Sequence, residues 1–95
     1  MEIMRTPETD RLFKAILELK NLDECYALFD DLCTIREMRD LTQRFAVAEM
    51  LRSGMSYLDI SQKTGASTAT ICRVNKCLMY GTGGYRRALD GEDAK

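Results

Sequence analysis

Residues 56–78 read SYLDISQKTGASTATICRVNKCL and predict two short helices that meet at a tight turn. Ser56 and Ser67 are suited to cap the two helices, and Gly65 supplies the flexible backbone that such a turn commonly needs. Small Ser61 leaves room for another helix to approach. The apolar positions expected to face a core recur at three- and four-residue spacings and are Ile60, Ile71, Val74 and Leu78. The stretch therefore predicts a helix-turn-helix.

The opposite face of the second helix is polar and small, which suits a helix that enters a DNA major groove about 12 Å wide. The candidate DNA-contacting residues are Ser61, Lys63, Ser67, Thr68, Ala69, Thr70, Cys72, Arg73 and Lys76. Arg73 is expected to touch phosphate or a guanine edge, or else to pair with an acid on a neighbouring helix. The two lysines are phosphate contacts or solvated charges. The hydroxyls of Thr68 and Thr70 are expected to contact phosphate or the groove edge, or else to bond back to their own helix.

Three helices are expected before the motif, and no alternating pattern is long enough for a strand. The first runs from Thr6 to about Leu19 behind Pro7, and an Asn21–Glu24 capping pair opens the second, which ends near Cys33. A Thr34–Glu37 capping box opens the third, which runs to Arg52. Their apolar stripes comprise Leu12, Phe13, Ile16, Leu17 and Leu19, then Leu22, Cys25, Leu28, Phe29 and Leu32, then Ile35, Met38, Leu41, Phe45, Ala48 and Leu51. The expected fold class is all-α.

After the motif, the glycine-rich segment GTGG at 81–84 favours a loop, and a short helix at 85–90 and a polar tail follow. Arg86 and Arg87 beyond this loop clamp a DNA backbone or form a solvated face. We expect one domain over residues 1–95. Residues 6–53 would form the core and dimerisation helices, 56–78 the helix-turn-helix, and 81–95 the loop, short helix and tail.

The charge distribution and the cysteine and histidine content bear on which functions are expected. The net charge is −1, but residues 1–33 hold eight acids against four bases, whereas residues 60–89 hold five bases and no acid. The four cysteines lack the spacing of a zinc site and the chain has no histidine, so we expect no metal site. For lack of a recognisable catalytic group, we also expect that the protein is not an enzyme. With neither a membrane-length apolar run nor a signal-peptide pattern, the expected location is cytoplasmic.

Residues 50–78, MLRSGMSYLDISQKTGASTATICRVNKCL, resemble the helix-turn-helix region of the tryptophan repressor family, and the whole chain resembles its YerC/YecD branch. The resemblance implies a Trp repressor-like helical bundle that forms an intertwined homodimer. It also implies a reading helix that begins near Ser67, with Thr68, Ala69 and Cys72 facing DNA and Ser61 at the first helix of the motif.

The resemblance also bears on an effector. Tryptophan-sensing members hold indole between two arginines and have a glycine after the second one. Here Arg73 matches the second arginine, but Val74 follows it. Arg44 matches the first only across a one-residue gap, and without the gap Gln43 takes its place. We expect no bound cofactor and leave the effector open, with Arg44 and Arg73 as its candidate binding residues and tryptophan disfavoured as co-repressor.

These observations together predict a sequence-specific, DNA-binding transcriptional regulator, a repressor by resemblance, that binds double-stranded DNA as a homodimer. The alternative is a helical protein-interaction module without sequence-specific DNA binding. The exposed side of the second helix separates them, because a protein-docking helix should carry large apolar anchors and this one carries Thr, Ala and Arg.

Overall fold

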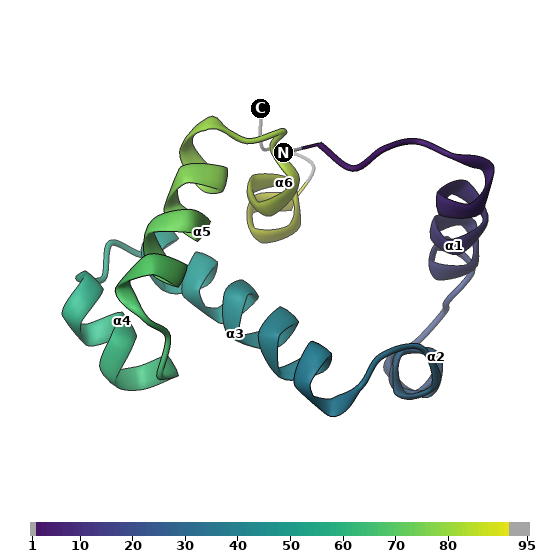
Figure 1. Ribbon diagram of the computed structural model, residues 1–95, viewed down its shortest axis with the longest axis horizontal. Helices are drawn as coiled ribbons and strands as arrows, with labels where there is room; N and C mark the ends of the chain where they lie inside the picture. Colours follow the sequence, from purple (N-terminus) through teal and green to yellow (C-terminus); the bar gives the residue numbers. More distant parts are fainter. Residues whose placement is uncertain (1, 92–95) are drawn as a thin grey trace. The chain divides into compact units, whose positions relative to one another are not determined.

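The computed structural model describes residues 2–91, and this part of the chain contains helices and no strand (Figure 1). The predicted all-α class is therefore confirmed. The helices are α1 (Pro7–Leu17), α2 (Leu22–Leu32), α3 (Ile35–Arg52), α4 (Tyr57–Thr64), α5 (Thr68–Tyr80) and α6 (Gly84–Asp90). The end of the predicted polar tail, residues 92–95, lies outside the described residues.

Side-chain caps set the starts of the first three helices. The Thr6 hydroxyl accepts a hydrogen bond from the Thr9 amide at 3.0 Å, and the Asn21 side chain accepts one from the Glu24 amide at 2.9 Å. The predicted capping box on α3 is reciprocal, because the Thr34 amide donates to the Glu37 carboxylate at 2.9 Å and the Glu37 amide donates to the Thr34 hydroxyl at 3.1 Å. These helices begin where the sequence predicted. The first ends at Leu17, two residues before the predicted Leu19.

The chain divides into two compact units, Met1–Met38 and Arg39–Lys95. In the first unit, no residue of α1 or α2 is buried. Large apolar side chains lie on its surface, and Leu17 is 81% exposed. The apolar stripes that the sequence predicted on these two helices have no core of their own to fill.

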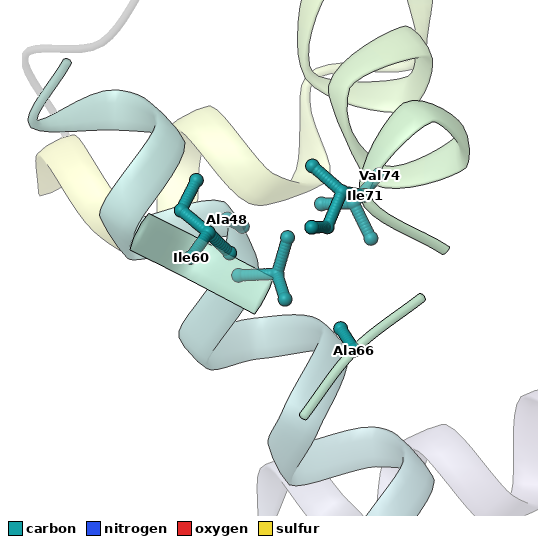
Figure 2. Close-up of a cluster of buried hydrophobic side chains, with 6 residues drawn as sticks. Ala48, Ile60, Ala66, Ile71 and Val74 are labelled. Carbon is teal, nitrogen blue, oxygen red and sulfur yellow. The ribbon is translucent and has the colours of Figure 1, made fainter. Parts of the chain in front are cut away.

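The second unit contains the hydrophobic core. Figure 2 shows Ala48 of α3, Ile60 of α4, and Ile71 and Val74 of α5 pointing toward one another, with Ala66 beside them from the turn before α5. All four predicted inward positions of the motif are buried. Val47 is also fully buried, although the predicted stripe on α3 did not include it. Ile35, Leu41 and Phe45 belong to the apolar stripe that the sequence predicted, but the structure leaves them exposed.

Candidate nucleic-acid interface

The turn between α4 and α5 is held by backbone and hydroxyl hydrogen bonds. Gly65 ends α4 in the left-handed region at φ +74°, where side-chain-bearing residues are strained, and its amide donates to the Ser61 carbonyl at 2.8 Å. The Ser61 hydroxyl donates to the carbonyl of Ala66 at 2.9 Å, across the turn. Ser61, a predicted DNA contact, is thus half-buried and engaged within the turn in the unbound protein.

A second set of bonds, which the sequence did not predict, fixes the turn to α3. The Thr64 hydroxyl donates to the Ile60 carbonyl at 2.7 Å and accepts from the Ala66 amide at 3.1 Å. The Gln43 side-chain amide donates to the Thr64 carbonyl at 3.1 Å. Residues 21 positions apart in the chain are joined here, so no local spacing could have signalled the contact. The turn is consequently held by α3 as well as by its own two helices.

The first turn of α5 is closed by its cap. The Ser67 hydroxyl accepts from the Thr70 amide at 3.2 Å, and the hydroxyls of Ser67 and Thr70 lie 3.2 Å apart as a hydrogen-bonded pair. Of the two alternatives for Thr70, the structure shows local bonding in the unbound protein. The neighbouring Thr68 is exposed at the start of the helix.

The face of α5 that points away from the core is largely exposed, although Thr70 is half-buried. The predicted DNA contacts that are exposed on this face are Ser67, Thr68, Ala69, Cys72, Arg73 and Lys76. Lys63, the other exposed predicted contact, lies on α4. Within residues 2–91, the ion pair that the structure contains joins Arg52 to Asp90, so Arg73 has no acidic partner here. The alternative in which Arg73 pairs with an acid of a neighbouring helix is therefore absent from this structure. Its guanidinium is left open to an external anion.

The helix α6 packs against the C-terminal part of α5 after the glycine-rich loop. Gly81 ends α5, and a Cβ at this position would collide with the Cys77 carbonyl oxygen, which explains the first glycine of GTGG. Gly83 lies at φ +91°, a conformation that favours glycine. The loop therefore reverses the chain so that α6 returns to α5.

Arg86 makes hydrogen bonds within the chain. Its Nε donates to the Leu78 carbonyl at 2.9 Å and its terminal nitrogen to the Met79 carbonyl at 3.4 Å, so it satisfies carbonyl groups at the end of α5. Arg87 remains exposed. The expectation that the pair is simply solvated is wrong for Arg86, because α6 returns close enough for intramolecular hydrogen bonds, whereas contact of the pair with a DNA backbone stays a prediction.

The other side of α6 is fastened to α3. Arg52 pairs with the Asp90 carboxylate, with its Nε at 3.1 and 3.2 Å from the two oxygens. The rings of Phe45 and Tyr85 have centroids 6.4 Å apart and are tilted by 41°. Tyr85 also packs against the buried core cluster. Helix α6 therefore contacts both α3 and α5.

The charges of the two candidate effector-binding arginines affect the pKa of Tyr85. Burial raises the pKa of the Tyr85 phenol, the electrostatic interaction with Cys77 raises it further, and the positive charges of Arg44 and Arg73 lower it. Arg44 is half-buried and Arg73 is exposed. Gln43, the alternative to Arg44, is instead engaged with Thr64. A side chain of the protein itself thus lies within electrostatic range of both arginines.

Other site types receive no support from the residues described. In residues 2–91, no group of three or more His, Cys, Asp or Glu side chains could hold a metal ion. The cysteines are free thiols; Cys25 and Cys33 are half-buried, whereas Cys72 and Cys77 are exposed. None of the helices in this range has the length and apolar character needed to cross a bilayer.

Comparison with known proteins connects this geometry to a family. A family model described as Trp repressor protein matches residues 7–93. The uncharacterised protein YerC of Bacillus subtilis is 58% identical over 87 residues, which cover 92% of this chain and 84% of YerC.

Two solved structures share the fold. A candidate Trp repressor from Staphylococcus aureus superimposes with a TM-score of 0.88 at 47% identity, covering 96% of this chain and 91% of the other. A TrpR-like protein from Eubacterium eligens gives a TM-score of 0.88 at 57% identity, covering 90% of this chain and 89% of the other. Both likenesses extend over nearly the whole length of the chains compared.

Proposed function

Because this chain belongs to the Trp repressor family, we propose that it is a sequence-specific DNA-binding regulator of transcription that acts as a repressor. The observation that carries the proposal is the exposed face of α5, which presents small and basic side chains above a buried apolar face. A helix with small side chains can approach base edges closely, and an exposed arginine can bind guanine or phosphate.

Each exposed side chain is assigned a proposed DNA contact according to its chemistry. Thr68, Ala69 and Cys72 lie on the part of α5 that would face base edges, and Arg73 would bind a guanine edge or a phosphate. Lys63 and Lys76 are exposed and would bind phosphates as flexible point charges. The remaining predicted contacts, Ser61, Ser67 and Thr70, would first support the turn and the cap, because their hydroxyls are already hydrogen-bonded.

We further propose that the regulator is an intertwined homodimer. The support is the exposed apolar surface of the first unit, including Leu17, Leu22 and Tyr26, each 74% exposed or more. A second copy of the same helices would cover these side chains, and two-fold symmetry would then give two reading helices for two half-sites about 34 Å apart. A cytoplasmic location is part of the same proposal.

Binding of short genomic duplexes by the purified protein tests the DNA proposal. Affinity should fall steeply between low and physiological salt, because bound lysine and arginine release counterions from phosphate. Arg73→Ala should weaken binding by about 10- to 100-fold, which corresponds to the roughly 1–3 kcal/mol of a good arginine contact. Arg11→Ala is the matched control, since Arg11 is an exposed arginine of α1 outside the motif.

Absence of duplex binding at low salt, or equal effects of the two substitutions, would contradict the proposal. A protein-interaction module is then the second candidate. The observation that favours it is the end of α5, where Met79 is 53% and Tyr80 81% exposed. Apolar anchors of this size are typical of protein-docking surfaces.

A further inference from the structure

The orientation of α5 depends on what supports the helix from behind, because base recognition requires its exposed face to be held in a fixed position. At its N-terminal end, α5 is held by the turn from α4 and by the buried side chains Ile71 and Val74. Its C-terminal end leads into the glycine-rich loop, and glycine residues can adopt a wide range of backbone conformations. The described structure supports this end through α6.

Two features of α6 provide this support. Arg86 donates two hydrogen bonds to carbonyls of the last turn of α5, one at 2.9 Å and one at 3.4 Å. Tyr85 places an aromatic ring where three helices meet, since it comes from α6, stacks at an angle on Phe45 of α3 and packs against the core cluster to which α5 contributes. The Arg52–Asp90 pair holds the far end of α6 to α3. The helix therefore links α5 to the longest helix of this unit.

We propose that α6 is a built-in brace for the DNA-reading helix, with Tyr85 and Arg86 as its positioning residues. This inference rests on the proposed function.

The position of Tyr85 permits a rescue experiment, because p-cresol is the tyrosine side chain as a free molecule. Tyr85→Ala should weaken duplex binding at least 10-fold, and millimolar p-cresol should restore at least part of that loss while leaving the wild type unchanged. Tyr85→Phe is the matched control, since it keeps the ring, and should bind within about threefold of the wild type. Circular dichroism of Tyr85→Ala without p-cresol, which should show the helix content of the wild type, separates a loss of positioning from a loss of folding.

Arg86 tests the brace with a milder change. Arg86→Ala should speed amide hydrogen exchange at least 10-fold in the last turns of α5, because the carbonyl groups of that end lose their donor. Arg87→Ala removes an exposed neighbour on the same short helix and should leave exchange unchanged. Exchange is measured without DNA, so it tests the brace even if the chain binds no duplex.

The outcomes are distinct for the two proposals. Wild-type protein that binds no duplex would overturn the DNA proposal, whereas unchanged exchange in Arg86→Ala would overturn the brace. Folded Tyr85→Ala with wild-type affinity, or with a loss that p-cresol does not reduce, would also overturn the brace.

Discussion

The two units of this chain differ in how they use their apolar residues. Helices α1 and α2 of the first unit have amphipathic stripes and no buried residue, whereas α3, α4 and α5 contribute a closed core in the second. Both regions have well-formed helix caps, so the difference does not lie in helix formation. It lies in tertiary burial, which supplies most of the stability of short helices. Under the proposed function, the first unit would pack against a second copy of the chain, and the second unit would present the DNA-reading surface.

The largest effect is expected where charge is introduced into the first unit. The double substitution Leu17→Glu with Leu22→Glu should weaken the proposed homodimer by about 10³-fold or more. Each buried leucine contributes about 1.5–3 kcal/mol, and symmetry repeats both substitutions. Sedimentation of the purified protein over a range of concentrations measures the change.

Lys20→Glu is the matched control, because Lys20 lies between the two leucines, is exposed, and gives the same change in net charge. It should leave the dimer intact. A wild-type chain that sediments as a monomer at all concentrations would remove the explanation offered for the exposed stripes.

In the second unit, the expected effect is on folding rather than association. Ile60→Ala should lower the free energy of unfolding by about 2–5 kcal/mol, because Ile60 is fully buried among the core residues. Leu58→Ala on the same helix should change it by no more than about 0.5 kcal/mol, since Leu58 is 68% exposed. Urea denaturation compares the two variants. If both variants lost similar free energies of unfolding, Leu58 would have to be buried in the protein in solution, contrary to its exposure in the single chain.

A smaller effect is expected at the turn of the motif. Gly65→Ala should cost about 1–2 kcal/mol, because the position has φ +74° and the left-handed conformation is unfavourable for residues with a Cβ. Gly84→Ala is the control, because it lies in α6 with open space around the added Cβ, and it should be neutral or stabilise by up to about 1 kcal/mol. Equal costs in thermal unfolding would mean that backbone conformation at Gly65 is not the limiting factor.

The smallest effect should appear at alkaline pH. The pKa of Tyr85 is raised above its ordinary value of 10.0, so the folded protein holds this proton more tightly than the unfolded chain does. The contribution is present below pH 10 and is lost as pH rises through the raised pKa. Tyr85→Phe should therefore lose less stability than the wild type between about pH 9 and 11. If the stability of Tyr85→Phe and of the wild type fell by the same amount between pH 9 and pH 11, the partly buried position of this phenol would be contradicted.

Much of the fold could be predicted because its signals are local. Caps such as Thr34 with Glu37 act within one turn, and the spacing of Ile71 and Val74 identifies the buried side of α5 without knowledge of its neighbours. Gly65 was predicted as the turn residue for the same reason.

What could not be predicted depends on contacts between distant residues. Gln43 donates to Thr64 across the unit, and Arg86 reaches the carbonyls of α5 only because the glycine loop reverses the chain. Val47 was missed because the predicted stripe of α3 followed Ala48 and Leu51 along a single face, whereas the core takes two adjacent residues, Val47 and Ala48. The DNA-contacting roles on α5 and the single-domain organisation remain predictions.

Selection of bound duplexes from random-sequence DNA, at two salt concentrations with and without L-tryptophan, tests the central claim most directly. A dimer that presents two braced reading helices should enrich an approximate palindrome, with half-sites about one duplex turn apart, and should do so without tryptophan. Enrichment should weaken at the higher salt concentration. No enrichment even at low salt, or enrichment of asymmetric single sites only, would contradict the account.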